Sequence, residues 1–329
     1  MVPVTSHRIA VFCDVGSPMA RTLLRGLVSA LGARSDARIV ALCPYRARGS
    51  WAEWGDWVGT GLLRAAQRAI DPALPWYRWG PAPIGLARFA RRTGCEIVTP
   101  DWTAPGIDAM ARRLSSLGAT AAMSFYMPRK LPQSLLCVFR SAINYHNGEV
   151  PRYRGMRTTH WAAYLREPTS GWTVHHMTDA LDAGNVLAAG AVPIGERSGM
   201  AEIEHAKAAQ AVGQLPQLLD RWLGGDPGEP QRGEARLFTR ADYEAITHVE
   251  NPGRLTSGEW LWRIRCFARV WARVGGVAWP VTRLVPTERI DGGTVGWRCA
   301  DGVCLRVTRA EFLPVGVYRV VQRLTRKFP

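Results

Sequence analysis

The chain has 329 residues, of which 47% are hydrophobic and 21% charged, as in a globular protein large enough to hold two hydrophobic cores. Its first residues lack a basic segment followed by a long apolar run, and no apolar stretch approaches the length of a membrane span, so we predict a soluble cytoplasmic protein. Seven scattered cysteines without CxxC or Cys/His spacing favour reduced thiols and give no metal-binding motif.

The net charge of +15 is unevenly distributed along the chain. Residues 251–329 carry 14 Arg and Lys against 5 Asp and Glu, a surplus of 9, whereas residues 1–250 carry 28 against 22, a surplus of 6. Such a basic final third is compatible with an anionic partner, including a nucleic acid.

The N-terminal elements predict a parallel sheet. HRIAVFCDV (7–15) is a short apolar run that ends at a Gly/Ser/Pro turn, and ARIVALCPY (37–45) is a second such run. Between them, residues 19–31 carry apolar side chains at helical spacing. This β-α-β order indicates right-handed crossovers, and the absence of GxGxxG after the first strand removes the usual dinucleotide-binding signature.

Residues 46–83 depart from the α/β alternation and read as an insertion. Trp51, Trp54 and Trp57 have helical i, i+3, i+6 spacing and are followed by PALPWYRWGPAP. The interpretation we favour is a packing face, since aromatic stripes at helical spacing usually belong to a core. The alternative is a lid or an apolar platform for a substrate.

The alternation then resumes. We expect a helix ending near residue 94 and a strand at 95–102, then a helix at 105–119 and a strand at 120–126, then a helix at 132–140 and a strand ending in AINYH (142–146). A helix at 159–167, a strand at 171–177 and an extended segment at 185–194 precede a long helix at 199–225, which Pro216 is expected to kink. Residues 1–225 are thus predicted to form an open, mostly parallel, Rossmann-like α/β sheet flanked by helices.

A second domain is predicted at 226–329. DPGEPQRGE (226–234) has the composition of a linker, and residues 259–274 form an amphipathic pattern that predicts a helix. Three β-prone segments follow at 281–290, 294–302 and 304–312, joined by Asp-Gly turns. We expect a smaller, mainly β, barrel-like C-terminal domain.

Two polar residues end a predicted strand in SAINYHNGEVPRYRG (141–155). Asn144 and His146 are two apart and therefore point to one face, at the strand end where open α/β sheets bind ligands. A second acidic loop, TDALDAG (178–184), contains Asp182. The alternative interpretation is purely structural: these residues would satisfy backbone groups at a strand end and in a turn.

The order of these motifs resembles the formyltransferase family that uses 10-formyltetrahydrofolate. The NxH pair is followed 36 residues later by a DAG loop, and the resemblance covers residues 85–225. MSFYM (123–127) is similar to the folate-side loop of the family, and PRYRG (151–155) to the turn after its catalytic His. The segments from 257 onward resemble the accessory domain of the methionyl-tRNA and sugar formyltransferases.

The resemblance implies roles for individual residues and no metal. The implied catalytic residues are Asn144, His146 and Asp182, and His175 matches a position outside that triad, so we interpret it as structural. The residues implied to line the folate site are Phe125, Tyr126, Met127, Asp179, Ala180 and Leu181. In the turn after His146, we expect Glu149, Tyr153 and Arg154 to face the acceptor, although Glu149 departs from the family pattern.

These residue types also suit formyl transfer on physical grounds. When an amine attacks a formyl carbon, the formyl oxygen becomes negative and the amine nitrogen positive. The amide of Asn144 and a protonated His146 can donate to the oxygen, while Asp182 can sustain the imidazolium or act as the base. A neighbouring carboxylate is expected to raise the pKa of His146.

The acceptor is less well defined by the sequence. Relatives show a small residue and then Ser-Leu-Leu-Pro after the catalytic His, whereas this chain has Asn147, Gly148, Glu149 and Val150 before Pro151. The basic loop by which methionyl-tRNA enzymes contact RNA is replaced by the Trp-rich segment. We therefore expect a small amine acceptor, most plausibly an amino sugar that is free or nucleotide-linked. Methionyl-tRNA formylation, a non-catalytic protein that binds RNA or another anion, and a homodimer remain alternatives.

Overall fold

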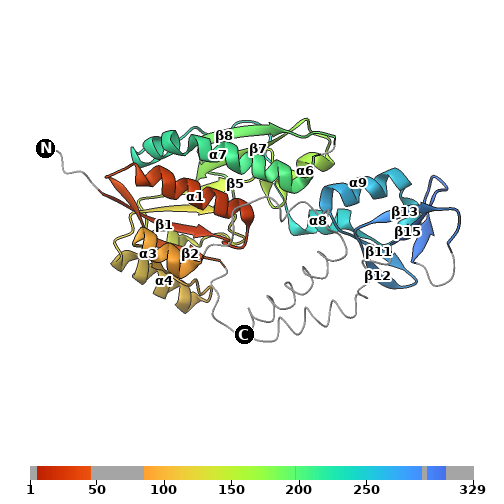
Figure 1. Cartoon of the computed structure of the whole chain (residues 1–329), viewed down its shortest axis with the longest axis horizontal. Coiled ribbons are helices and arrows are strands. Elements are labelled where there is room, and N and C mark those ends of the chain that lie inside the picture. The colour runs from red at the N-terminus through yellow and green to blue at the C-terminus, as the bar shows by residue number, and fades with distance from the viewer. Residues whose placement is uncertain (1–5, 46–84, 197, 291–294, 309–329) are drawn as a thin grey trace. The chain divides into compact units, whose positions relative to one another are not determined.

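A computed structural model describes residues 6–45, 85–196, 198–290 and 295–308 (Figure 1). The chain folds into two compact units: the described residues within 6–45, 85–162 and 167–237 form the first, and those within 163–166 and 238–308 form the second. The predicted Trp-rich insertion at 46–83 lies outside the described residues, as does the end of the predicted strand at 304–312.

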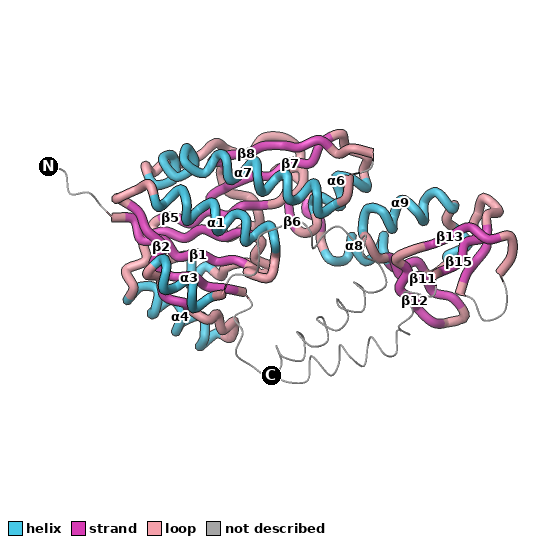
Figure 2. The backbone as a smooth tube through the Cα atoms, in the orientation of Figure 1, coloured by secondary structure: helices cyan, strands magenta, loops and turns pink. Residues whose placement is uncertain are grey.

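The first unit contains a seven-stranded sheet with the order β3-β2-β1-β4-β5-β7-β8 (Figure 2). The pairs from β3 to β5 are parallel, and β5–β7 and β7–β8 are antiparallel. The strands are β1 (His7–Cys13), β2 (Ala37–Pro44), β3 (Glu96–Ile97), β4 (Ala121–Phe125), β5 (Ser141–His146), β7 (Thr169–His176) and β8 (Val186–Pro193). The predicted open, mostly parallel α/β sheet is confirmed.

Helices cover both faces of this sheet, as the alternation along β1 requires. Ile9 and Val11 point into one core with α1 and α7, whereas Ala10 and Phe12 point into the opposite core with α4 and α5. The helices of this unit are α1 (Pro18–Gly32), α3 (Leu86–Thr93), α4 (Ala104–Ser116), α5 (Gln133–Leu136), α6 (Thr158–Tyr164) and α7 (Met200–Leu223). The last residues of α6 are grouped with the second unit.

Helix α1 shows how the sequence specifies this packing. The Ser17 side chain accepts a hydrogen bond from the Ala20 amide and so caps the helix, and Pro18 occupies the first turn, where its missing N–H is harmless. The predicted stripe is buried, with Leu24 and Leu27 at 0% exposure. Gly26 lets α1 approach α7 closely.

The second unit is small and rich in strands. Its core contains Trp260 and Trp297, whose ring centroids lie 4.6 Å apart. Its sheets have the orders β10-β11-β12 and β13-β15-β14. The elements are β10 (His248–Val249), β11 (Val270–Val274), β12 (Val277–Val281), β13 (Leu284–Thr287), β14 (Gly296–Arg298), β15 (Cys304–Val307), α8 (Arg240–Thr247), the 3-10 helix η2 (Pro252–Arg254) and α9 (Ser257–Phe267). Two short strands, β6 (Arg154–Gly155) and β9 (Leu237–Phe238), complete the described chain.

Three predicted elements are wrong in extent. The helix predicted at 259–274 ends at Phe267, because Ala268 adopts a left-handed φ of 62° and the following Val-rich residues form β11. The strand predicted at 95–102 is reduced to β3, which pairs at the sheet edge and stops before Pro100. The helix predicted at 132–140 is the single turn of α5.

The predicted linker at 226–234 makes specific contacts with the first unit. The Val186 amide donates to the carbonyl of Glu229 at 2.7 Å, and the Gln231 side chain donates to the carbonyls of Asp182 and Gly184 at 2.9 and 2.8 Å. Residues 226–237 therefore support the loop that carries Asp182. Just before this segment, α7 runs through Pro216 without interruption.

Within the described ranges, no helix is both long and apolar enough to cross a membrane.

The contact between α1 and α7 gives a test of the packing. A Cβ on Gly26 would lie 2.7 Å from a methyl carbon of Val212, whereas a Cβ on Gly213 of α7 would meet nothing within 4 Å. We expect Gly26→Ala to lower the free energy of unfolding, because overpacking costs about 1–3 kcal/mol. The matched Gly213→Ala should raise it by about 0.5–1 kcal/mol through helix propensity alone. Urea denaturation of both variants measures the difference, and a stabilised Gly26→Ala would contradict this packing.

Candidate active site

The end of β5 carries Asn144 and His146 on the same face of the sheet, as their spacing predicts. In the antiparallel pair with β7, Asn144 lies opposite His175 and His146 opposite Thr173. The adjacent residues Ile143 and Tyr145 point to the other face, into the core with α7. The strand thus presents one amide and one imidazole next to each other, with the His146 side chain almost fully buried.

Asp182 reaches this pair from the loop between β7 and β8. One carboxylate oxygen, Oδ2, lies 3.4 Å from Nδ1 of His146 and accepts the Gly155 amide at 2.9 Å. The residue itself has a left-handed φ of 50°, and a Cβ on Gly184, two residues later, would fall 1.9 Å from the His176 carbonyl oxygen. The loop is therefore folded tightly against β7, and it brings the third predicted residue into contact with the second.

His175 also belongs to this cluster, which the interpretation of His175 as a residue outside the triad did not anticipate. Its Nε2 lies 3.4 Å from the amide nitrogen of Asn144 and 3.5 Å from Oδ1 of Asp182, so it links the two side chains. Its Nδ1 donates to the carbonyl of His176 at 2.8 Å. The only sequence signal was position, since in an antiparallel pair a residue opposite Asn144 shares its face.

The charges in this cluster are set by burial. Burial lowers the pKa of His146, although Asp182 acts to raise it, so the expectation of a carboxylate-raised pKa is wrong. Burial acts to raise the pKa of Asp182, but the interaction with His146 and the contacts with His175 and the Gly155 amide bring it to about 2. Nε2 of His146 donates to the Tyr153 carbonyl at 2.7 Å, which leaves the lone pair on Nδ1, facing an ionised carboxylate.

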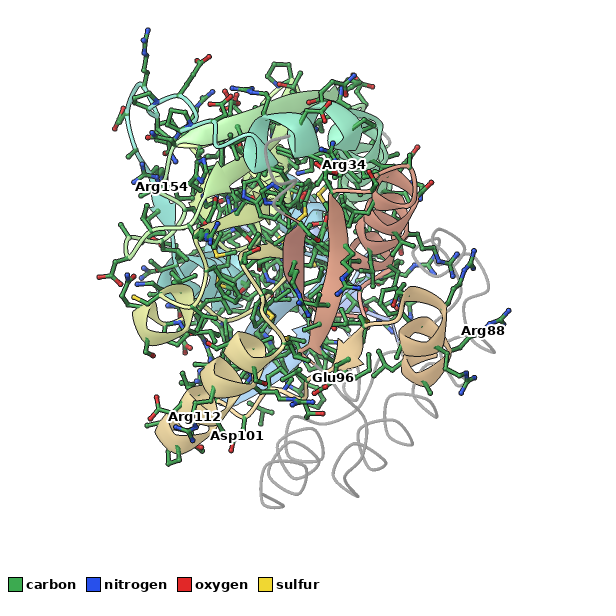
Figure 3. The ribbon with its side chains drawn as sticks, turned by 90° about the vertical axis from the view of Figure 1, so that its left-hand side faces the viewer. Arg34, Arg88, Glu96, Asp101, Arg112 and Arg154 are labelled. Carbon is green, nitrogen blue, oxygen red and sulfur yellow. The ribbon has the colours of Figure 1, made fainter. Side chains whose placement is uncertain are left out.

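The residues predicted to face the acceptor have different surroundings. Glu149 is exposed, but the Tyr153 hydroxyl donates to Glu167 at 2.9 Å and the Arg154 guanidinium donates to Gln231 at 2.6 and 3.1 Å. Figure 3 shows Arg154 on the side of the molecule away from Arg88. Among the residues that the structure describes, no hydrogen-bond partner is found for the Glu149 side chain, and the roles of all three residues toward an acceptor remain predictions.

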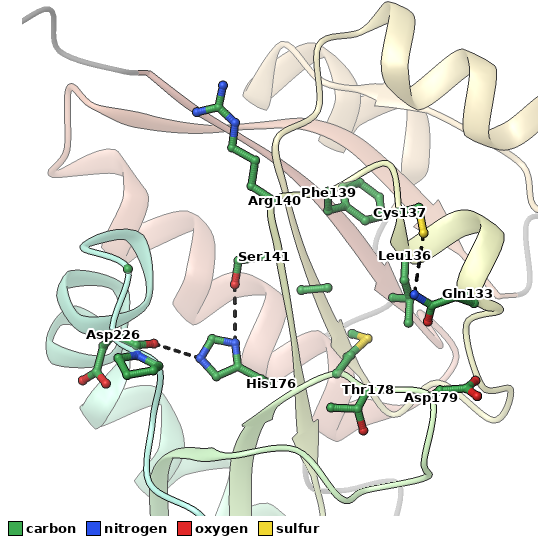
Figure 4. A pocket seen from close by; sticks show the side chains of 14 residues that line it. Gln133, Leu136, Cys137, Phe139, Arg140, Ser141, His176, Thr178, Asp179 and Asp226 are labelled. Atoms are coloured by element: carbon green, nitrogen blue, oxygen red, sulfur yellow. Dashed lines mark hydrogen bonds between the residues drawn. The ribbon is translucent and has the colours of Figure 1, made fainter.

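A hollow of about 730 Å³ lies along the first residues of β5, next to α5 and the loop that leads to Asp182 (Figure 4). Ala142 and Met177 line it from the face of the sheet that carries Asn144, and Thr178 and Asp179 line it from the loop that leads to Asp182. Gln133 and Leu136 line it from α5. Further lining residues are Ser141 at the start of β5, His176 at the end of β7 and Asp226 after α7. The lining residue of β5 nearest to Asn144 is Ala142, which precedes it by two residues in the strand.

Of the six predicted folate-site residues, Asp179 alone lines this hollow. Asp179 also accepts a hydrogen bond from Lys130 at 2.9 Å, which ties its loop to the segment after β4. Phe125 is buried in the core, Tyr126 stacks on Tyr145 at 5.7 Å, and Leu181 is 44% exposed. The remaining two, Met127 and Ala180, are partly buried and exposed, respectively. The sequence did not predict that Ala142 and Met177 line a common hollow, because that follows from the pairing of β5 with β7.

Comparison with known proteins shows what the part of the chain that carries this cluster is similar to. A family model described as Formyl transferase matches residues 105–219, which include the whole cluster. A GDP-perosamine N-formyltransferase of Brucella melitensis is 28% identical over 101 residues, which are 31% of this chain and 39% of that relative. Residues 105–219 of this chain are therefore similar to the formyltransferase family, and the chain spans about two fifths of the length of the curated relative that it matches.

Solved structures show the same fold. A 4-N formyltransferase from Francisella tularensis has a TM-score of 0.58 at 15% identity, covering 87% of this chain and 100% of that one. An N-formyltransferase from Helicobacter canadensis, in complex with folinic acid and dTDP-3-aminofucose, has a TM-score of 0.53 at 14% identity. The match covers 92% of this chain and 99% of that one. Among the residues that the structure describes here, no group of three His, Cys, Asp or Glu side chains could hold a metal ion.

The lowered pKa of His146 can be measured directly. In an NMR titration of histidine-labelled protein, we expect this ring to titrate below its ordinary value of about 6.5. Asp182→Asn should lower its pKa further, because the carboxylate favours the imidazolium. The depressed pKa also makes acid destabilising, since below pH 6.5 the unfolded chain binds a proton that the folded chain does not. A ring that titrates at or above 6.5 would contradict this description.

Proposed function

We propose that this protein is an N-formyltransferase that moves a formyl group from 10-formyltetrahydrofolate to the primary amine of an amino sugar carried on a nucleotide. The observation that supports this best is the meeting of three groups: the Asn144 amide, the His146 imidazole and the Asp182 carboxylate. At the end of β5, His146 lies 3.4 Å from Asp182, and His175 lies 3.4 Å from Asn144 and 3.5 Å from Asp182. The family match and the sugar-modifying relatives agree with the proposal.

The three groups match the charges that amine formylation creates. One N–H of Asn144 points to His175, and the second is available to the formyl oxygen as it becomes negative. Nδ1 of His146 carries a lone pair and takes the proton that the attacking nitrogen loses. Asp182, held ionised, stabilises the resulting imidazolium. No protein nucleophile is needed, because the acceptor amine attacks the formyl carbon directly. The bond between the formyl carbon and N10 of the folate then breaks, and the imidazolium of His146 gives its proton to N10, so that tetrahydrofolate leaves.

The hollow suits the folate part of the donor. Ala142 and Met177 offer apolar contacts to a flat heterocycle, while Gln133, Thr178 and Asp179 offer polar groups at its rim. 10-Formyltetrahydrofolate supplies the activated formyl group, and a ring bound here would direct it along β5 toward Asn144. Folinic acid in the Helicobacter canadensis structure supports this assignment of the donor.

The acceptor assignment rests on relatives and on local charge. The Brucella melitensis relative acts on GDP-perosamine, and the Helicobacter canadensis structure contains dTDP-3-aminofucose. In this chain the exposed carboxylate of Glu149 lies in the turn that follows His146 and would attract a protonated amino sugar. We place the catalytic domain at residues 1–225 and assign the basic C-terminal part an accessory role.

An acceptor screen tests the function. Purified protein, 10-formyltetrahydrofolate and a panel of nucleotide-linked amino sugars should release tetrahydrofolate and give a product heavier by one formyl group in place of one hydrogen. His146→Ala should lower turnover by at least about 10²-fold while donor affinity stays within a few-fold, because the ring handles protons and does not line the hollow.

Methionyl-tRNA is the competing acceptor in the same screen. The basic C-terminal third favours it, and its formylation would fall steeply between low and moderate salt, whereas a small acceptor would respond weakly. Formylation of tRNA alone would refute the sugar assignment. No tetrahydrofolate release with any amine would refute the enzyme itself, and tight salt-dependent RNA binding would then favour a binding protein.

A further inference from the structure

A buried lysine lies on the other side of β5 from the imidazole. Lys207 has 0% exposure and sits on α7 in the apolar stripe formed by Ile203, Ala211 and Leu215. The chain has only three lysines, at positions 130, 207 and 327. Because burying an ammonium group is costly unless it is fully hydrogen-bonded, this lysine requires an explanation.

The ammonium group of Lys207 is surrounded by oxygen atoms. Its Nζ lies 3.0 Å from the carbonyl of Asn147, 2.6 Å from Oγ1 of Thr159, 3.0 Å from Oγ of Ser170 and 3.2 Å from the carbonyl of Gly171. An ammonium group has three N–H donors, and all of them find acceptors here. These oxygens come from three elements, namely the end of β5, the start of α6 and the start of β7.

Glu204 accompanies this lysine one turn earlier on α7. It attracts Lys207 electrostatically and is hydrogen-bonded to the side chains of Thr159 and Asn147. Burial lowers the pKa of Lys207 and raises that of Glu204, while their mutual attraction acts in the opposite direction. The four oxygen acceptors favour the charged form of the lysine, so α7 places a hydrogen-bonded cation and a nearby carboxyl group beneath the strand that carries Asn144 and His146.

The oxygen that Lys207 holds belongs to the residue directly after His146. The Asn147 carbonyl also accepts the Thr158 hydroxyl, and the next carbonyl, of Gly148, accepts the Thr173 hydroxyl at 2.9 Å. There is no spare room in this turn: a Cβ on Gly148 would lie 2.4 Å from the Tyr153 carbonyl oxygen and 2.7 Å from Nε2 of His146. A shift of the Asn147 carbonyl therefore moves the ring and its hydrogen bond to Tyr153.

We propose that Lys207 is a positioning residue for His146: by holding the Asn147 carbonyl from the opposite face of the sheet, it fixes the direction in which the imidazole leaves β5. This inference rests on the proposed function in so far as His146 is the base. Lys207 itself touches neither the Nδ1 lone pair nor the hollow, so it acts through the backbone.

The first test replaces Lys207 with methionine, which keeps the length of the side chain and removes its donors. Displacing a catalytic group by about 1 Å can cost on the order of 10²-fold in turnover, so we expect Lys207→Met to lower kcat by about that factor. The KM for 10-formyltetrahydrofolate should stay within a few-fold, because the lysine does not line the hollow. Ser170→Ala is the matched control, since it removes one Lys207 acceptor and leaves the Asn147 contact; its kcat should change less than about three-fold.

A second readout does not depend on catalysis. The ¹⁵N shifts of the His146 ring report whether Nε2 carries the proton that the Tyr153 carbonyl accepts. In the wild type we expect one tautomer, protonated at Nε2; in Lys207→Met we expect a mixture, because the ring is no longer fixed. Loss of Lys207 leaves Glu204 buried without its partner, so the double variant Lys207→Met/Glu204→Gln is measured as well, and it should show the same mixture in a folded protein.

The outcomes separate this inference from the proposed function. A folded Lys207→Met or double variant with wild-type kcat and the wild-type ring tautomer would overturn the positioning role. If Ser170→Ala loses as much kcat as Lys207→Met, the lysine supports the fold in general and the positioning role is equally overturned. If the wild type transfers no formyl group to any acceptor, the proposed function fails, and the ring shifts alone then decide the inference.

Discussion

The antiparallel pairing of β5 with β7 is the constraint on which the site depends. It sets Asn144 opposite His175 and reverses the chain, so that the loop after β7 returns Asp182 to the imidazole. A slip of one residue in β5 would turn Asn144 and His146 into the α7 core and bring Ile143 and Tyr145 to the site. The buried aromatic stack of Tyr145 on Trp172, with centroids 5.9 Å apart, lies on that other face and holds the register.

The strand separates two buried polar clusters of different kinds. On one face, Asp182 is charged next to a ring that burial keeps neutral, which leaves an acceptor for a proton. On the other face, the Lys207 ammonium group donates to oxygens of the surrounding segments, and Glu204 attracts it electrostatically. A paired cluster stiffens its surroundings, whereas an incompletely paired one can react. Strand β5 therefore has the hydrogen-bonded Lys207 cluster on one face and, on the other, the His146 ring with its proton-accepting nitrogen.

The local sequence pattern was sufficient to predict much of the fold and of the candidate site. The alternation of apolar runs and helical stripes predicts the sheet, and the i, i+2 spacing places Asn144 and His146 on one face. The sequence pattern gave wrong element lengths where contacts between distant residues decide them. Helix α9 ends early at Ala268, and β3 is short because it is an edge strand. His175 was interpreted as structural and Lys207 was missed because their partners lie far away in sequence, at position 144 for His175 and at positions 147 and 159 for Lys207. Their significance follows from register and helix packing, which composition and spacing do not contain.

The groups proposed to handle charge and those proposed to face the acceptor differ in how they are held. The groups that handle charge are held by backbone and by one another, within the region that matches the family. Near them, the Tyr153 hydroxyl donates to Glu167 and the Arg154 guanidinium to Gln231, whereas the Glu149 side chain is exposed. On the proposed function, exchanging an exposed residue of this turn such as Glu149 can therefore alter the choice of acceptor without moving the imidazole and the carboxylate, which are buried.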